Sequence, residues 1–298
     1  MTPKKSPLTD PRKKYPAPPF PLQTQAFPGL QSEMTPVPDC GEGSYEGSKK
    51  LAGRKALITG GDSGIGRAAA IAYAREGADV AISYLPEEEK DAQEVKSLIE
   101  AAGQKAILLP GCIKNEGWCQ ELVEKAVQNL GGLDILVNNA GHQKFEEDLL
   151  NITTEDFDWT MKTNIYAMFW ITKAALPHLL PGSSIIITSS IVAFDSSETL
   201  VDYSMTKAAG YSFAKSMAKQ LGPKGIRVNA IAPGPIWTPL QISGGQSEEK
   251  YQKFGEDSLL ERPGQPAELA QAYVLLASDE GSAITGQVYG VTCGGRLA

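Results

Sequence analysis

The chain contains 298 residues, of which 42% are hydrophobic and 21% are charged. This length and apolar content suffice to bury the core of one large domain or two small ones. A membrane span is excluded, because the best candidate, from Tyr166 to Leu180, is shorter than about 18 residues and is interrupted by Lys173. A secretory signal peptide is not expected, because proline-rich polar sequence follows the basic start of the chain.

The formal net charge of −7 argues against general affinity for nucleic acid phosphates. The four cysteines lack the paired spacing of metal ligands and only two histidines are present, so we expect no metal site. The cysteines are Cys40, Cys112, Cys119 and Cys293. We expect a reduced, soluble, cytoplasmic protein that binds neither nucleic acid nor membrane.

The first 50 residues differ in texture from the rest of the chain, since half of the 20 prolines precede residue 39. Proline blocks helix and removes backbone donors, and few aliphatic residues are available here to form a core. We predict an extended arm over residues 1–50; a disordered tail is the alternative. Five apolar or aromatic residues are spaced like anchors on a folded surface: Tyr15, Phe20, Leu22, Phe27 and Leu30.

From Leu51 onward, short apolar runs alternate with longer amphipathic ones, which is typical of repeated βαβ units. Strands are expected at 55–59, 79–83, 105–109, 134–137, 184–188, 226–231 and 287–291. Helices are expected near 64–76, 87–102, 115–130, 154–180, 202–221 and 266–277. Residues 51–298 are therefore predicted to form one α/β domain with a Rossmann-type, doubly wound, seven-stranded parallel sheet and helices on both faces.

A glycine cluster follows the first expected strand, in the run Thr59-Gly-Gly-Asp-Ser-Gly-Ile-Gly-Arg67. Glycines at 60, 64 and 66 permit a tight turn, close approach to a pyrophosphate and close packing of helix on strand. The start of the next helix then offers free N–H groups to phosphate. Because the cluster lies between a strand and a helix, it indicates a dinucleotide cradle rather than a merely tight turn.

The spacing Gly-x-x-x-Gly-x-Gly resembles that of the short-chain dehydrogenase/reductase family, in its subgroup of short chains. Further matches follow in order along the chain: Asn138-Asn139-Ala140-Gly141, Asn164, Ser189-Ser190, Tyr203-x-x-x-Lys207 and the run from Pro233 to Thr238. The proline-rich arm resembles the extension of a bacterial branch with general-stress proteins and aldehyde- or glucose-dehydrogenase-like oxidoreductases. The resemblance implies a homotetramer.

The pattern Tyr-x-x-x-Lys occurs three times, so its position must decide which copy has a function. Only Tyr203 lies near a helix start with a serine, Ser190, at the end of the preceding strand. Ligands of open α/β sheets bind beyond the carboxyl ends of the strands, which favours this copy. The three pairs are Tyr45/Lys49, Tyr203/Lys207 and Tyr211/Lys215.

These residue types indicate an acid/base site. Moving a hydride to or from a carbinol carbon requires a proton transfer at its oxygen, so Tyr203 is assigned as the general acid/base, with a pKa lowered by the ammonium of Lys207. Ser190 would hydrogen-bond the substrate oxygen. By resemblance, Lys207 also holds the nicotinamide ribose and Asn164 orders a water for proton relay. A purely structural role of Asn164 in its helix is the alternative.

The resemblance also implies the cofactor-binding set, which includes Tyr203 and Lys207. Two positions depart from the family: Tyr84 replaces the acid common in NAD-preferring members, and Cys112 replaces an Asp that pairs with adenine. We expect use of NAD or NADP with a lean toward NAD, because acids at 87–89 would repel a 2′-phosphate. The other members of the set are Gly60, Asp62, Ser63, Gly64, Ile65, Gly66, Tyr84, Cys112, Ile113, Asn139, Ala140, Gly141, Pro233, Gly234, Ile236 and Thr238.

The substrate is left open as an aldehyde, ketone, sugar or polyol. Enoyl reductases usually have a longer Tyr–Lys interval, so carbonyl/alcohol chemistry is favoured. Residues 240–258 are predicted to be a mobile lid, and His142, Gln143, Phe194 and Trp237 are candidates for the pocket. Cys112 is expected to be a buried, inert thiol; a redox switch is the alternative. The alternative function is a nucleotide-binding stress or scaffold protein without turnover.

Overall fold

A computed structural model describes residues 8–297 of the chain. Within this range, seven strands form one parallel sheet in the order β3-β2-β1-β4-β5-β6-β7. The order reverses between β1 and β4, and a doubly wound sheet opens a crevice at such a point. The strands are β1 (Lys55–Thr59), β2 (Asp79–Tyr84), β3 (Ala106–Pro110), β4 (Ile135–Asn138), β5 (Ser184–Thr188), β6 (Arg227–Pro233) and β7 (Val288–Val291).

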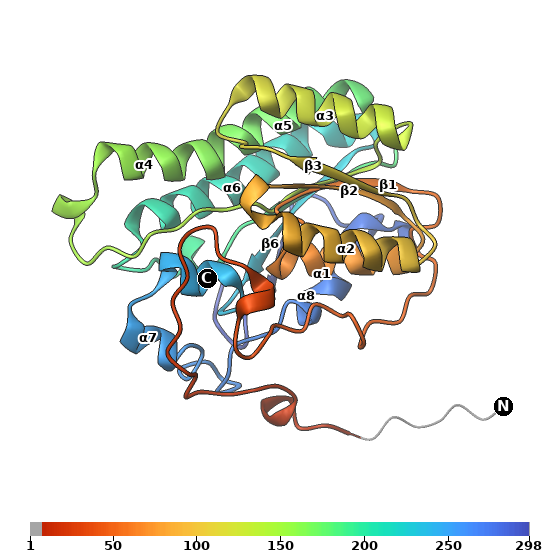
Figure 1. Cartoon of the computed structure of the whole chain (residues 1–298). Coiled ribbons are helices and arrows are strands. Elements are labelled where there is room, and N and C mark those ends of the chain that lie inside the picture. The colour runs from red at the N-terminus through yellow and green to blue at the C-terminus, as the bar shows by residue number, and fades with distance from the viewer. Residues whose placement is uncertain (1–7, 298) are drawn as a thin grey trace.

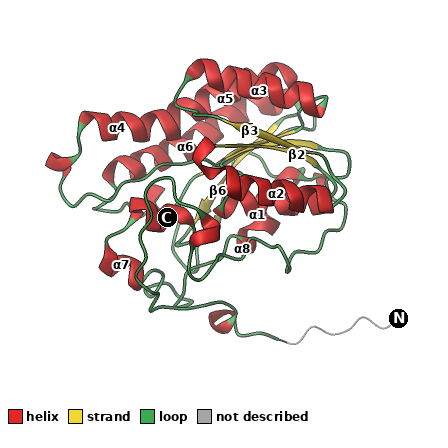
Figure 2. Cartoon of the chain, viewed as in Figure 1, coloured by secondary structure: helices red, strands yellow, loops and turns green. Residues whose placement is uncertain are grey.

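Helices cover both faces of the sheet (Figures 1 and 2). One face carries α1 (Gly64–Arg75), α2 (Glu89–Ala101) and α8 (Ala267–Ala277), and the other carries α3 (Glu116–Leu130), α5 (Ala167–Ala175) and α6 (Val201–Leu221). Alternate residues of β1 divide between two cores, because successive strand side chains point to opposite faces. The predicted doubly wound fold is therefore confirmed. Between residues 8 and 297, no helix is long and apolar enough to cross a membrane.

The long helix expected over 154–180 is interrupted, which corrects that prediction. The segment consists of α4 (Thr154–Met161), a π-helical turn (Lys162–Tyr166) and α5. Asn164 lies in the middle of this turn, where its side-chain oxygen accepts the His142 N–H at 2.7 Å and its amide donates to the His142 carbonyl at 2.9 Å. These two hydrogen bonds need Asn164 to face the loop after β4, and the wider turn aims it there.

Residues 8–50 cross the surface of the sheet domain as an extended segment with two short 3₁₀ turns, Pro11–Lys13 and Gln31–Glu33. Figure 1 shows this red-to-orange trace passing α7 (Glu248–Gln252) before it reaches β1. Phe20 is buried and stacks on Trp237, with ring centroids 4.2 Å apart. Leu22 is 60% exposed, so its expected role as an anchor is wrong. Residues 1–7 of the predicted arm lie outside the described range.

The last part of this segment is bound to the end of α1 through one buried carboxylate. Glu76 accepts hydrogen bonds from the Tyr45 hydroxyl at 2.6 Å, the Ser48 amide at 2.8 Å and the Lys50 amide at 2.9 Å. Burial by itself would raise the pKa of Glu76, but these hydrogen bonds together hold it below its ordinary value. Residues 45–50 are thus fixed on the sheet domain by a charged group.

The segment predicted as a lid, residues 240–258, contains a π-helical turn (Gln241–Gly245) and α7. It packs directly against the arm: the Gln25 amide donates to the Ile242 carbonyl at 3.2 Å, and the Phe20 amide donates to the Gln252 carbonyl at 2.9 Å. Ile242 shares a small apolar core with Phe20. A displacement of this segment would therefore require the arm to move or these contacts to break.

Candidate active site

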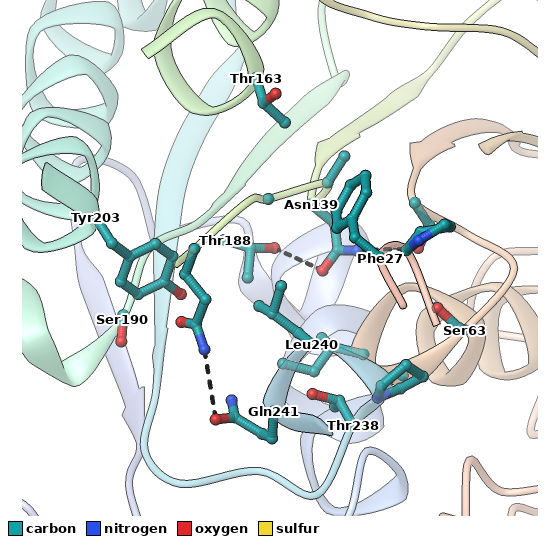
Figure 3. Close-up of a pocket in the computed structure, with 18 of the residues that line it drawn as sticks. Phe27, Ser63, Asn139, Thr163, Thr188, Ser190, Tyr203, Thr238, Leu240 and Gln241 are labelled. Atoms are coloured by element: carbon teal, nitrogen blue, oxygen red, sulfur yellow. Dashed lines mark hydrogen bonds between the residues drawn. The ribbon is translucent and has the colours of Figure 1, made fainter. Parts of the chain in front are cut away.

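A cavity of about 810 Å³ lies at the carboxyl ends of the strands (Figure 3). This volume is within the range of small-molecule and cofactor sites. Of the catalytic and cofactor-binding residues assigned from the sequence, all but Gly66 and Asn164 line it. They are Gly60, Asp62, Ser63, Gly64, Ile65, Tyr84, Cys112, Ile113, Asn139, Ala140, Gly141, Ser190, Tyr203, Lys207, Pro233, Gly234, Ile236 and Thr238.

The glycine loop is shaped by a close approach that only glycine permits. A Cβ on Gly66 would lie 1.8 Å from the Gly60 carbonyl oxygen and 2.6 Å from Nδ2 of Asn139. That Nδ2 donates to the carbonyls of Thr59 and Gly60, each at 3.1 Å, and Oδ1 of Asn139 accepts the Thr188 hydroxyl at 3.2 Å. One amide therefore joins the ends of β1, β4 and β5 and holds the backbone cradle that a dinucleotide phosphate fits.

Tyr203 and Lys207 lie one turn apart on α6, and both are buried. The Lys207 ammonium is 5.2 Å from the centroid of the Tyr203 ring and donates to the Thr188 carbonyl at 2.9 Å. Burial lowers the pKa of Lys207 to about 8. Figure 3 shows Tyr203 and Ser190 on the same side of the cavity.

The pKa of the Tyr203 phenol is raised in the structure, whereas the sequence predicted that it is lowered. Burial raises the pKa of Tyr203 above its ordinary value, and the interaction with the Ser190 hydroxyl only partly opposes this effect. Ser190 belongs to the loop after β5, where its hydroxyl also accepts the Val192 amide at 3.3 Å. Burial therefore favours the protonated phenol over the phenolate in these surroundings.

Asn164 lies behind the wall, beside Gly141 and Lys207. A Cβ on Gly141 would be 3.4 Å from the Lys207 ammonium and 3.8 Å from Oδ1 of Asn164. Asn164 also donates to the Thr206 hydroxyl at 2.9 Å. A second cavity of about 20 Å³ is lined by Asn164, Lys207 and Thr206, which is room for one water.

The part of the large cavity that is lined by Glu87 and Glu88 is acidic. Tyr84 donates its hydroxyl to Glu89 at 2.7 Å, and Glu87 and Glu88 line the wall next to it. Burial, together with the neighbouring Asp91 carboxylate, raises the pKa of Asp62. Arg67 is buried and paired with Glu42 at 2.9 Å and Glu94 at 3.2 Å, so its charge is already balanced. Cys112 is exposed on this wall, which corrects the expectation of a buried thiol.

The other Tyr-x-x-x-Lys pairs differ in their surroundings. The Lys215 ammonium lies 5.0 Å from the Tyr211 ring centroid, nearly the geometry of Lys207 and Tyr203. Tyr211, however, stacks on Phe194 at 5.0 Å and packs against the helix layer. Tyr45 donates to Glu76. The cavity wall contains Tyr203 alone of the three tyrosines, within the described residues.

Several predicted pocket residues have other surroundings, and several lining residues were missed. Trp237 is fully buried beneath the arm. His142 is buried and stacked on Trp159, and burial lowers its pKa to about 4. Gln143, Leu240 and Gln241 do line the cavity. Among the missed residues, Phe27, Pro28 and Trp159 are not adjacent to any site motif, whereas Lys114, Thr163 and Thr188 are next to residues that the sequence did mark.

The chain matches a known protein family over most of its length. Residues 60–295 match a family model described as Enoyl-(Acyl carrier protein) reductase. An uncharacterized oxidoreductase of Bacillus subtilis, YhxD, is 57% identical over 290 residues, which cover 96% of this chain and 97% of the relative. The chain belongs to the short-chain dehydrogenase/reductase family. The predicted membership is confirmed.

Further relatives match the predicted branch. General stress protein 39 of Bacillus subtilis is 52% identical, covering 92% of this chain and 96% of that protein. An Arabidopsis thaliana protein named NADPH-dependent aldehyde reductase 1, chloroplastic, is 42% identical, covering 88% and 93%. A Burkholderia cenocepacia short chain dehydrogenase crystallised in complex with NADP has a TM-score of 0.77 and 32% identity, covering 83% of this chain and 99% of its own. The Arabidopsis thaliana protein is named for NADPH and the Burkholderia cenocepacia protein was crystallised with NADP, so neither supports a lean toward NAD.

Proposed function

We propose that the protein is an oxidoreductase that uses NAD or NADP to interconvert a carbonyl compound and an alcohol. The observation that carries this proposal is the placement of the Tyr203 and Ser190 hydroxyls at one wall of the cavity, with the Lys207 ammonium behind them. The glycine cradle at the other wall fits a dinucleotide phosphate. The nicotinamide, when bound, supplies or accepts the hydride.

Carbonyl reduction requires the protonated form of the phenol, and burial of Tyr203 favours that form. Tyr203 donates its proton to the substrate oxygen, while Ser190 hydrogen-bonds the same oxygen and stabilises the charge that develops there. Lys207 stabilises the phenolate that remains. A water in the small cavity beside Asn164 returns a proton through Lys207, whose pKa of about 8 allows it to release and regain one.

Two other functions compete with this proposal. The family model's description suggests reduction of an enoyl group, but the interval of four residues between Tyr203 and Lys207 is shorter than is usual for such enzymes. A scaffold protein that only binds nucleotide would have no need for a buried phenol, hydroxyl and ammonium at one wall of the cavity.

A substrate panel separates these functions. Purified protein is incubated with NADH or NADPH and a series of aldehydes, ketones, sugars and enoyl thioesters, and the nicotinamide absorbance is followed. Turnover of aldehydes or ketones is expected. Turnover of enoyl thioesters alone would favour the second function, and dinucleotide binding without any turnover would favour the scaffold.

We retain a lean toward NAD as a proposal, despite the NADP-associated relatives. Glu87 and Glu88 line the cavity where the adenosine ribose of the family is bound, and the only cations among the described lining residues are Lys114 and Lys207. A 2′-phosphate near the two glutamates would be repelled. We expect kcat/KM for NAD to equal or exceed that for NADP. A tenfold advantage of NADP, about 1.4 kcal/mol, would contradict this lean.

We further propose a cytoplasmic homotetramer in which residues 1–50 form an arm on a catalytic domain of residues 51–298. Large apolar side chains on α5, α6 and the π-helical turn are exposed, namely Phe169, Met205 and Tyr166, and they favour burial against another subunit. All four cysteines are free, as is usual in a reducing compartment. Sedimentation of the full chain tests the assembly, and a monomer would contradict it.

A further inference from the structure

The segment from Gln25 to Gln31 of the arm contributes two residues to the cavity wall. Phe27 and Pro28 line the cavity, although they belong to the arm and lie far before β1 in the chain. Figure 3 separates Phe27 from Tyr203 by the width of the cavity. Phe27 therefore lies on a different side of the cavity from Tyr203.

This segment is locally rigid, because the Gln25 side chain closes it into a loop. Nε2 of Gln25 donates to the Leu30 carbonyl at 3.0 Å, and Oε1 accepts the Leu30 amide at 2.5 Å. Phe27 and Pro28 lie at the tip of this loop, between Gln25 and Leu30 in the chain. The tip is thus held in one conformation without help from a ligand.

The loop contacts three different walls of the cavity. Phe27 packs edge-on against His142 at 5.2 Å and against Trp159 at 5.4 Å between ring centroids. A Cβ on Gly29 would lie 3.1 Å from Cβ of Ser243, in the segment predicted as a lid. Gln31 accepts the Gly64 amide at 2.7 Å.

The contact between Gln31 and Gly64 reaches the phosphate cradle itself. Gly64 is the first residue of α1, and its N–H is already bound to Gln31, so the donors left for an anion are the N–H groups that follow it at the helix start. The Gln31 backbone amide donates in turn to Asp91 of α2 at 2.5 Å, and Gln31 is 1% exposed. The arm therefore contacts the start of α1 through Gln31 and lines the cavity through Phe27 and Pro28.

We propose that residues 25–31 are a strap over the bound dinucleotide, with Phe27 as the residue that restricts its release. This inference rests on the proposed function, since the ligand is the dinucleotide of that function. The contacts of Phe27 with His142 and Trp159 would slow the departure of a nucleotide held beneath the strap. The strap acts on nucleotide release and leaves the chemical step to Tyr203.

The test compares Phe27→Ala with wild type by displacement of bound NADH and NADPH, followed by stopped-flow fluorescence. Phe27 is 37% exposed, so the variant is expected to fold. We expect dissociation about tenfold faster, the size of effect that loss of one aromatic contact gives, and nearly unchanged single-turnover reduction at saturating nucleotide. Phe27→Leu should recover part of the slow release. Leu22→Ala, an exposed change in the same arm, is the matched control and should dissociate as wild type does.

Several results would overturn the strap. Dissociation from Phe27→Ala within twofold of wild type would do so, as would equal acceleration in Leu22→Ala. A slower single turnover with unchanged release would place Phe27 at the reacting end instead. Wild-type protein that binds no dinucleotide would remove both this inference and the proposed function. Wild-type protein that binds dinucleotide but turns over no substrate would contradict the oxidoreductase alone, and the strap would still be decided by the dissociation rates.

Discussion

Phe20→Ala should detach the arm from the sheet domain. Phe20 is 3% exposed and stacks on Trp237 at 4.2 Å, in a small core with Met34 and Tyr251. Removal of a buried phenyl ring loses its transfer free energy and leaves a cavity, at a cost of about 3–5 kcal/mol. At about 1.4 kcal/mol for each factor of ten, the arm should open roughly 10² to 10³·⁵ times more often.

Hydrogen exchange of the Gln25 amide measures this opening, because that amide donates to the Ile242 carbonyl only while the arm is docked. The protection factor of this amide should fall by the same factor of roughly 10² to 10³·⁵. If the free energy of docking is smaller than the roughly 3–5 kcal/mol lost, the amide should exchange at the unprotected rate. The Leu22→Ala control, at a side chain that is 60% exposed, should change protection only a few-fold. Equal protection in Phe20→Ala and wild type would refute the packing argument.

Two further substitutions test the supports of the arm and of the cradle. Glu76→Gln should lower the free energy of unfolding by about 1–3 kcal/mol at pH 7, because three donors lose a charged acceptor. The pKa of Glu76 is lower in the folded than in the unfolded state, so the stability difference between wild type and Glu76→Gln should shrink as pH falls through about 4. Urea titrations at several pH values measure this difference, and a constant value would contradict the role of the Glu76 charge. Gly66→Ala should abolish dinucleotide binding, because its Cβ would overlap the Gly60 carbonyl oxygen. Gly222→Ala is the control: a Cβ there would meet no atom within 4 Å, and its φ is −53°. This variant should keep dinucleotide binding, and its free energy of unfolding should rise by up to about 1 kcal/mol. Calorimetric titration with NADH decides this pair, and binding by Gly66→Ala would contradict the overlap.

Sequence reasoning predicted the order of strands and helices well, because each element carries its own periodicity and its own glycine punctuation. The cradle at Gly60, Gly64 and Gly66 could be predicted for the same reason, since loop and helix start are adjacent in sequence. Tyr203 could be separated from Tyr211 by its distance along one helix. These inferences all concern residues that are close together in the chain.

What could not be predicted depends on contacts between distant segments. Phe20 meets Trp237 across more than 200 residues, and nothing in the arm specifies where it docks. The π-helical turn around Asn164 follows from hydrogen bonds to the loop after β4. The raised pKa of Tyr203 follows from burial, which neighbours in sequence do not report. Cys112 is exposed for a similar reason, because the cavity opens beside it.

The most direct test of the catalytic assignment compares Tyr203→Phe with Tyr211→Phe. Each change removes one hydroxyl and keeps the ring, and the two tyrosines have nearly the same distance to a lysine ammonium. With the best carbonyl substrate, kcat of Tyr203→Phe should fall by roughly 10² to 10⁴, the range for loss of a general acid, while dinucleotide binding persists. Tyr211→Phe should stay within a few-fold of wild type. Near-normal turnover by Tyr203→Phe would contradict the account.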